Sequence, residues 1–157
     1  AHPEIRRRLV RGLAAHNREN PGSSTRITRA LMMPEPPQID AGEITATIEG
    51  DLLFSSGSAS LKTAAKSSLD TVVQTIASEY PGRSIRISGH TDTDKIKKSP
   101  FKSNYHLGFE RAWAVRNYII SRGINENLIH VASFGASHAQ STKARSRRVE
   151  IAIILNE

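Results

Sequence analysis

Asp92 and Arg111 are charged residues in distant parts of the chain, and their types suit the binding of a small molecule that carries both charges. A guanidinium donates two parallel hydrogen bonds to one carboxylate, which a lysine cannot do, and an aspartate accepts hydrogen bonds from an ammonium group. Two opposite charges held at a fixed separation select a zwitterion over a plain cation or a plain anion. We therefore expect this pair to bind the two charged ends of an amino acid.

Other chemistry is open to the same stretch of sequence. Asp92 and Arg111 could form an ion pair with each other, because ion pairs between exposed side chains are common and weak. His90 and Asp92 are types that bind metals, but no third ligand lies at a suitable spacing, so we expect no metal site and no cofactor. We expect His90 to be a structural residue that hydrogen-bonds to the backbone. Ser99 and Lys102 match the Ser-x-x-Lys pattern of penicillin-recognising enzymes without its partner motifs, so we predict no catalytic residues.

The hydrophobic pattern predicts the elements that position these residues. Four stretches alternate between apolar and polar residues and predict strands: 44–48, 84–89, 129–133 and 149–155. Two stretches place apolar residues at helical spacing and predict helices: 61 to about 80, and 104 to about 122. The order strand–helix–strand–helix–strand–strand predicts an α+β fold, a two-layer sandwich in which one sheet carries both helices on one face.

Two details of this pattern bear on Asp92 and Arg111. Gly89 ends the strand before Asp92, and its missing side chain permits a bulge or a close approach of another backbone. We expect Arg111 to lie beside the core face of its helix and not within it, and we expect Trp113 to be a packing residue. The residues expected on that core face are Gly108, Ala112, Val115 and Ile119.

Positive charge is concentrated near the start of the chain. The formal net charge is +7 over 157 residues, and residues 1–30 contribute +5 of it through seven arginines against Glu4 and Glu19. Nucleic-acid binding would need stacking aromatic residues beside such charge, and this basic segment has none, so we expect no nucleic-acid partner. The chain has no cysteine, which excludes disulfides and thiolate chemistry.

The first part of the sequence differs from the rest in its pattern. Residues 3–19 predict a helix with a narrow apolar stripe, and residues 23–43 hold three prolines and predict a connector with a short strand near residues 26–32. We therefore divide the chain into a basic N-terminal helix and linker, residues 1–43, and a compact domain, residues 44–157. The stripe of the predicted helix consists of Ile5, Leu9 and Leu13, with a weaker contribution from Val10.

Three blocks of residues occur in order along the chain: Gly89-His-Thr-Asp92, then Asn104-x-x-Leu107-Gly108-x-x-Arg111-Ala112-x-x-Val115, then Arg147-Arg148-Val149-Glu150-Ile151. Together with the segment 52–61, they resemble the OmpA-like peptidoglycan-binding domain, over about residues 44–154. That family includes outer-membrane protein A, the peptidoglycan-associated lipoprotein and the flagellar stator protein MotB. Gly108 and Ser146 depart from the usual Ser and Asn of the family, and twelve positions separate Asp92 from Asn104. These departures leave the subfamily unassigned but do not affect the resemblance to the domain.

The resemblance implies non-covalent binding of the peptidoglycan stem peptide through meso-diaminopimelate. Asp92 would take the ammonium of this ligand and Arg111 its carboxylate. The remaining residues that the resemblance assigns to the pocket are Thr91, Asn104 and Leu107, which would shape it, and Arg147, which would border it.

The expected role is to anchor an envelope protein to the cell wall from the periplasm, without catalytic activity. A membrane anchor outside these residues and a homodimer are both left open. The main alternative is an OmpA-like fold that acts as a protein-interaction or structural module without binding peptidoglycan. A cell-wall hydrolase and a nucleic-acid binder are further alternatives, for which the sequence offers no catalytic set and no stacking residues.

Overall fold

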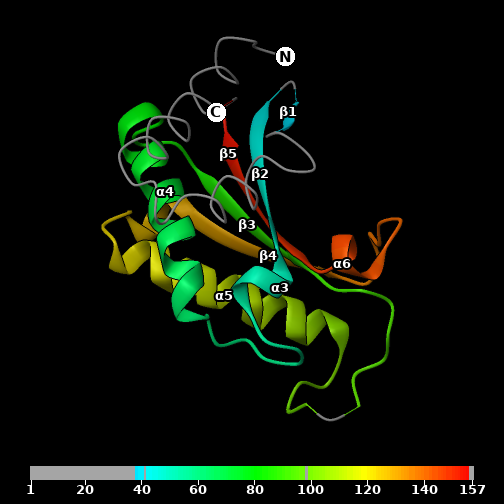
Figure 1. Cartoon of the computed structure of the whole chain (residues 1–157). Helices are drawn as coiled ribbons and strands as arrows, with labels where there is room; N and C mark the ends of the chain where they lie inside the picture. The colour runs from blue at the N-terminus through cyan, green and yellow to red at the C-terminus, as the bar shows by residue number, and fades with distance from the viewer. Residues whose placement is uncertain (1–37, 41, 98, 156–157) are drawn as a thin grey trace.

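The computed structural model describes residues 38–40, 42–97 and 99–155, which form one sheet with helices packed on it (Figure 1). The sheet has five strands in the order β1-β2-β5-β3-β4. Neighbouring strands are antiparallel except β3 and β4, which are parallel. The strands are β1 (Gln38–Asp40), β2 (Glu43–Glu49), β3 (Ile85–His90), β4 (Ile129–Gly135) and β5 (Arg148–Ile154).

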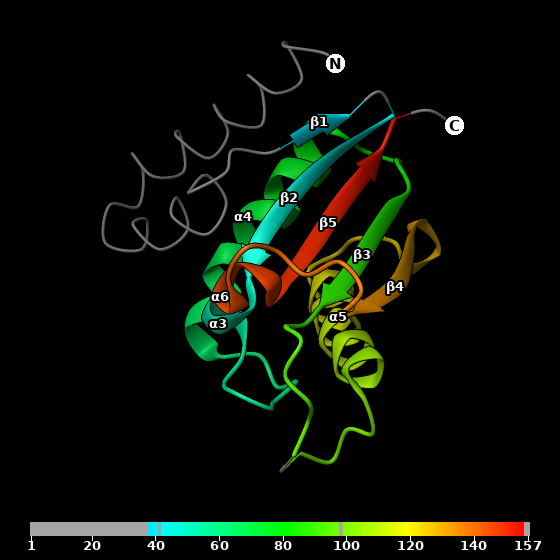
Figure 2. The same ribbon diagram turned by 90° about the vertical axis from the view of Figure 1, so that its right-hand side faces the viewer.

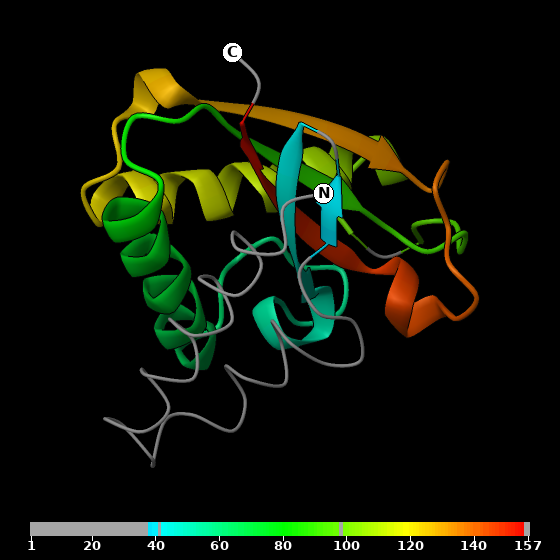
Figure 3. The same cartoon turned by 90° about the horizontal axis from the view of Figure 1, so that it is seen from above.

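Two long helices, α4 (Thr63–Glu79) and α5 (Asn104–Ser121), cover the same face of the sheet (Figure 2, Figure 3). Shorter helical turns connect other elements: α3 (Gly50–Leu53), η1 (Glu126–Leu128) and α6 (Lys143–Ser146). The predicted two-layer α+β sandwich is therefore confirmed, and its six predicted elements are β2, α4, β3, α5, β4 and β5. No helix among the described residues is long and apolar enough to span a membrane.

The core lies between the sheet and the two helices. In β3, Ile85 and Ile87 are fully buried against it, whereas the intervening Arg86 is partly exposed on the other face. Burying an aliphatic side chain of this size contributes about 1.5–3 kcal/mol, so the alternation fixes which face of the strand meets the helices. The expected core face of α5 is also confirmed, because all four of its residues are buried.

The structure adds elements that the sequence pattern did not predict. The strand β1 lies inside the stretch expected to be a connector and pairs with β2 at the edge of the sheet. The short helices α3 and α6 lie in stretches for which no helix or strand was predicted. The predicted helix 3–19 and the predicted strand near 26–32 lie outside the described residues, and the domain boundary after residue 43 stays a prediction.

Strand directions bring three segments to one edge of the sheet. Both β2 and β3 run antiparallel to β5, so β2 and β3 run in the same direction and end at the edge where β5 begins. The residues that follow β2, those that follow β3 and the residue that precedes β5 therefore meet there. This edge holds Asp51, Asp92 and Arg147.

Gly89 and Gly108 let the backbones of β3 and α5 come into contact. A Cβ atom at residue 89 would overlap the carbonyl oxygen of Gly108, so only glycine fits there. The pairing of β3 with β4 also shifts register between Gly89 and His90. Both outcomes expected for Gly89, a bulge and a close approach, are therefore present. The contact places the start of α5, and with it Arg111, close to the end of β3.

The exposed side of α5 carries aromatic residues. Trp113 is 40% exposed and stacks on Phe109 and beneath the guanidinium of Arg116, so its rings contact its own helix and do not enter the core. The expectation that Trp113 is a packing residue is therefore confirmed, and its packing partners lie three and four positions away on the surface of its own helix.

Candidate functional site

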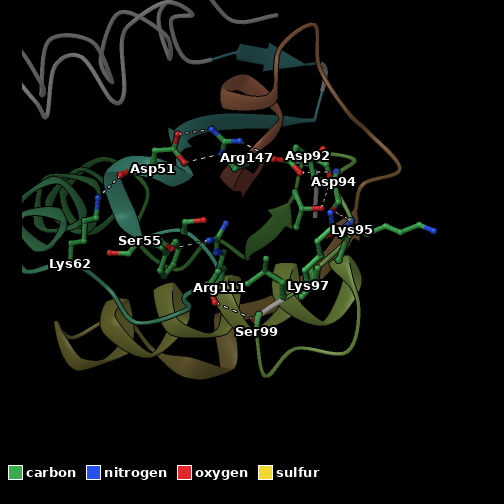
Figure 4. Close-up of a pocket in the computed structure, with 17 residues that line it drawn as sticks. Asp51, Ser55, Lys62, Asp92, Asp94, Lys95, Lys97, Ser99, Arg111 and Arg147 are labelled. Carbon is green, nitrogen blue, oxygen red and sulfur yellow. Dashed lines mark hydrogen bonds and ion pairs between the residues drawn. The ribbon is translucent and has the colours of Figure 1, made fainter.

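A cleft of about 630 Å³ opens at the edge of the sheet where β2 and β3 end (Figure 4). Its walls come from α3 and the loop after it, the loop after β3, the first two turns of α5 and the residue that precedes β5. All six residues predicted for a binding site line this one cleft: Thr91, Asp92, Asn104, Leu107, Arg111 and Arg147. The structure therefore brings together residues that are up to 56 positions apart in the sequence.

Arg111 is held in place by neutral partners. Its Nε donates to the carbonyl oxygen of Ser58 at 2.9 Å, and its Nη2 donates to that of Ser55 at 3.3 Å. The guanidinium carbon lies 5.1 Å from the centroid of the Phe54 ring, within the range of a cation–π contact. These contacts bury the residue to 4% exposure, deeper than a position beside the core face would require.

The guanidinium of Arg111 keeps open donors on the side that faces the cleft. Among the described residues it forms no ion pair, and its Nη1 makes no hydrogen bond. A guanidinium has five N–H groups, so three remain after the two bonds to carbonyl oxygens, including the pair on Nη1 and Nη2 that can fork onto a carboxylate. Arg111 is thus a buried cation that forms no ion pair with any described residue.

Burial lowers the pKa of Arg111 from its ordinary value. The carboxylates of Asp51 and Asp92 raise this pKa, and the neighbouring charge of Arg147 lowers it further. An arginine stays charged in proteins in spite of such shifts. An additional anion nearby would therefore stabilise the charged guanidinium of Arg111. The electrostatics of the cleft therefore favour a ligand carboxylate beside Arg111.

Asp92 lies on the other side of the cleft and is only 14% exposed at its side chain (Figure 4). Its Oδ1 accepts a hydrogen bond from the backbone N–H of Asp94 at 2.9 Å, and its Oδ2 accepts one from Nη1 of Arg147 at 2.8 Å. A carboxylate has about four acceptor positions, so about two of them remain for a ligand. The alternative in which Asp92 pairs with Arg111 is wrong, because its arginine partner is Arg147.

Arg147 connects Asp92 to a second acid, Asp51. Its Nε and Nη2 donate to Oδ1 and Oδ2 of Asp51, both at 2.9 Å, in a two-pronged ion pair. These hydrogen bonds hold the pKa of Asp51 below its ordinary value against the effect of partial burial, and they raise the pKa of Arg147. Arg147 was expected to border the pocket, and the structure places it in the cleft lining.

The three other predicted residues shape the cleft. Thr91 is buried, and its N–H donates to the carbonyl oxygen of Gly135 at 2.8 Å, which ties the loop after β3 to the end of β4. The side-chain amide of Asn104 donates to the carbonyl oxygen of Asp94 at 3.1 Å, which ties the same loop to the start of α5. Leu107 is buried and supplies an apolar wall.

Sequence reasoning missed Asp51 and Lys62 as part of this cleft. Lys62 donates from Nζ to the backbone carbonyl oxygen of Asp51 at 2.8 Å. A signal for Asp51 does exist, because it follows the first predicted strand as Asp92 follows the second. Two strands that run in the same direction end at one edge, so acids after both of them converge. That inference needs the strand directions, which the sequence pattern leaves open.

His90 has no role in the cleft and points to the opposite, helix-free face of the sheet. Its ring is buried and stacks on Phe134 with centroids 5.0 Å apart, and Nε2 lies 3.5 Å from Oε2 of Glu150. Neither ring nitrogen forms a hydrogen bond within the described part of the chain. The expectation that His90 bonds to the backbone is therefore wrong, although its structural role fits this packing. The described residues also contain no cluster of three or more His, Cys, Asp or Glu side chains that could hold a metal ion.

The loop that follows Asp92 adds lysines to the rim of the cleft. Lys95 and Lys97 line it and are exposed, and Lys95 extends outward into solvent (Figure 4). Ser99 donates from its hydroxyl to the carbonyl oxygen of Gly57 at 3.2 Å, which joins this loop to the loop after α3. Ser99 of the Ser-x-x-Lys pattern therefore joins two loops, and Lys102 takes no part in this contact.

A family model described as the OmpA family matches residues 53–151 of the chain. Over 93 residues the chain is 32% identical to the peptidoglycan-associated lipoprotein of Rhizobium meliloti (strain 1021). That alignment covers 59% of this chain and 50% of the lipoprotein, so the chain spans about half of the length of this relative.

Solved structures with the same architecture include the periplasmic domain of Helicobacter pylori MotB. It superposes with a TM-score of 0.71 at 25% identity, over 76% of this chain and 78% of that one. The cell wall anchor of the T6SS from Pseudomonas aeruginosa superposes with a TM-score of 0.74 at 21% identity, over 92% of this chain and 97% of that one. The second likeness shows a shared fold.

Proposed function

This chain belongs to the OmpA family, and from that membership we propose that it binds peptidoglycan non-covalently and anchors an envelope protein to the cell wall. The names of two similar proteins support this proposal, since one is a peptidoglycan-associated lipoprotein and the other a cell wall anchor. The proposed place of action is the periplasm, in line with the periplasmic domain of MotB.

The observation that carries the ligand assignment is the incomplete coordination of Arg111. A buried guanidinium normally has an anionic partner, because burying an unpaired charge is costly. Within the described part of the chain, the guanidinium of Arg111 hydrogen-bonds to two carbonyl oxygens and contacts the Phe54 ring, and it keeps a forked pair of donors open toward the cleft. We take the missing partner to be a ligand carboxylate.

The proposed ligand is the diaminopimelate of the stem peptide. Its free end carries one ammonium group and one carboxylate on the same carbon atom, which is the zwitterion that a separated acid and guanidinium select. The carboxylate would fork onto Nη1 and Nη2 of Arg111, and the ammonium would donate to the open acceptor positions of Asp92. Thr91, Asn104 and Leu107 would hold the loop and wall around it. No covalent step is part of this role.

Calorimetric titration of the 157-residue chain with meso-diaminopimelate and with a stem tripeptide that contains it tests the proposal. We expect both to bind, and we expect Asp92→Ala and Arg111→Ala each to abolish binding and the retention of the protein on purified sacculi. Each variant removes one of the two charges that the zwitterion needs. Circular dichroism and thermal unfolding would establish that both variants keep the fold.

Arg122→Ala serves as the matched control for the loss of an arginine from the end of the same helix. Arg122 is exposed and pairs with Asp70 at 3.0 Å, away from the cleft lining. We expect it to bind like the wild type. Wild-type retention by both cleft variants would refute the site, and a folded wild type that binds neither ligand nor sacculi would favour the alternative of an interaction module.

A further inference from the structure

The ion cluster of Asp51, Arg147 and Asp92 shares one guanidinium unequally between two acids. Arg147 presents its Nε and Nη2 edge to both oxygens of Asp51, at 2.9 Å each, and reaches Asp92 with Nη1 alone, at 2.8 Å (Figure 4). The two-pronged contact is the stronger and more directional of the two. Asp51 therefore decides how the guanidinium of Arg147 is oriented.

Two hydrogen bonds hold the backbone around Asp51 in place. The N–H of Gly50 donates to the carbonyl oxygen of Arg147 at 2.7 Å, and a Cβ atom at Gly50 would lie 3.1 Å from that oxygen. The Nζ of Lys62 donates to the carbonyl oxygen of Asp51. The helix α3 is thus attached directly to the residue that precedes β5, and Asp51 cannot move away from Arg147 without breaking the bond from Gly50.

The orientation of Arg147 determines how much of Asp92 is available. With Asp51 in place, Arg147 occupies one acceptor position on Oδ2 of Asp92, and the N–H of Asp94 occupies one on Oδ1. Without Asp51, the guanidinium would be free to turn its fork onto both oxygens of Asp92, because a forked pair is the preferred geometry for an arginine and a carboxylate. That rotation would take acceptor positions that a ligand ammonium needs.

We infer that Asp51 is a positioning residue for ligand binding: it holds Arg147 in a two-pronged ion pair and so keeps Asp92 open to the ligand ammonium. This inference rests on the proposed function. It assigns no ligand contact to Asp51 and gives Arg147 the role of a shared counter-ion. Arg147 thereby stabilises the charge of Asp92 and leaves acceptor positions of this carboxylate open to the ligand.

Calorimetry with meso-diaminopimelate on the full 157-residue chain tests the inference. Asp51→Asn should weaken binding about tenfold, because Arg147 then competes with the ligand for Asp92. Asp51→Glu, which can restore the two-pronged pair, should recover most of the affinity. The double variant Asp51→Asn with Arg147→Gln should bind more tightly than Asp51→Asn alone, because the competing guanidinium is gone. A purely structural role of Asp51 would predict a further loss in the double variant.

Asp94→Asn is the matched control for charge. Asp94 is another acid of the cleft lining, and its carboxylate pairs with Lys143 at 3.0 Å and not with Arg147. We expect it to weaken binding less than Asp51→Asn does. An equal loss in both variants would mean that the charge of the cleft, and not the position of Arg147, explains the result, and would overturn the inference.

A crystal structure of Asp51→Asn without ligand gives a readout that does not depend on binding. We expect two nitrogens of Arg147 on the two oxygens of Asp92, and an unmoved Arg147 would overturn the inference. The two proposals fail in different ways. If the wild type does not bind diaminopimelate, the proposed function fails and takes the inference with it. If the wild type binds and Asp51→Asn binds equally well, the inference alone fails.

Discussion

At the scale of single residues, the main feature of the cleft is a cation that is fixed in place by neutral groups. Two carbonyl oxygens and the Phe54 ring hold the guanidinium of Arg111, so its side chain is ordered without any anion. Ordering a long side chain on binding costs about 0.5–1.5 kcal/mol of binding free energy. In this protein the side chain of Arg111 is already ordered by folding, so binding does not incur that cost. The open donors of Arg111 are therefore arranged for a carboxylate in advance.

Replacing Arg111 by lysine tests whether the fork or only the charge is needed. We expect Arg111→Lys to weaken binding of diaminopimelate about tenfold to a hundredfold, since a lysine cannot donate two parallel hydrogen bonds to one carboxylate. Calorimetry measures the change. Arg122→Lys makes the same substitution at the end of the same helix outside the cleft, and we expect it to bind normally. Normal binding by Arg111→Lys would show that charge alone is enough.

At the scale of the elements, the distance between Asp92 and Arg111 depends on how α5 lies against β3. The two elements meet through Gly89 and Gly108, and any side chain at residue 89 would overlap the backbone of the helix. Asp92 follows the end of β3, and Arg111 lies about one turn of α5 beyond Gly108. A change in this contact would therefore change the width of the cleft.

Gly89→Ala should destabilise the fold by about 2 kcal/mol or more, because the overlapping atom is backbone and cannot turn away. Gly108→Ala should destabilise the fold less than Gly89→Ala does. A Cβ atom there would lie 2.5 Å from the hydroxyl oxygen of Ser133, which can rotate, although it would also lie 3.1 Å from the carbonyl oxygen of Gly89. Urea unfolding followed by circular dichroism measures both changes. A larger loss in Gly108→Ala would contradict this account of the contact.

At the scale of the whole molecule, the two faces of the sheet have different chemistry. The face toward α4 and α5 is apolar, whereas the helix-free face holds a charged cluster in which Arg148 donates to Oε1 of Glu150 at 2.8 Å and His90 lies beside Oε2. Burial raises the pKa of Glu150, and the contacts with His90 and Arg148 outweigh it, so that the pKa of Glu150 falls from 4.5 to about 2. The bond to Arg148 is the shorter contact, and we regard it as the stronger one.

This lowered pKa predicts a loss of stability in acid. A carboxyl whose pKa is lower in the folded state stabilises the fold above its unfolded pKa, and that contribution disappears as the pH falls through the folded value. Glu150 should therefore contribute on the order of 3 kcal/mol to the free energy of unfolding above about pH 4.5. This contribution should be lost by about pH 2. Urea midpoints at several pH values measure this, and Glu150→Gln should flatten the profile over that range.

Glu126→Gln is the control for this pH profile. Glu126 is exposed and lies 3.4 Å from Arg116 in a weak ion pair on the surface. We expect its variant to keep the acid dependence of the wild type. If Glu150→Gln retained the same dependence as Glu126→Gln, other carboxyl groups would be responsible for the acid loss.

The elements of the compact domain could be predicted because their signals are local. Alternation marks β3 and β5, and helical spacing marks α5, since each pattern depends only on which face of its own element is buried. Short elements gave no such signal. The helices α3 and α6 have four residues each and β1 has three, too few to establish a period.

The sequence by itself determined the order of the main elements through local patterns, and through its motif blocks it determined the family and, by that resemblance, six of the residues that line the cleft. Only the tertiary structure decided which groups form hydrogen bonds and ion pairs with each other. It gave Arg147 to Asp92, carbonyl oxygens to Arg111, and a place in the cleft to Asp51. The physical reason is that these contacts join residues 53 to 96 positions apart, whose distances follow from strand direction and helix packing and not from local pattern.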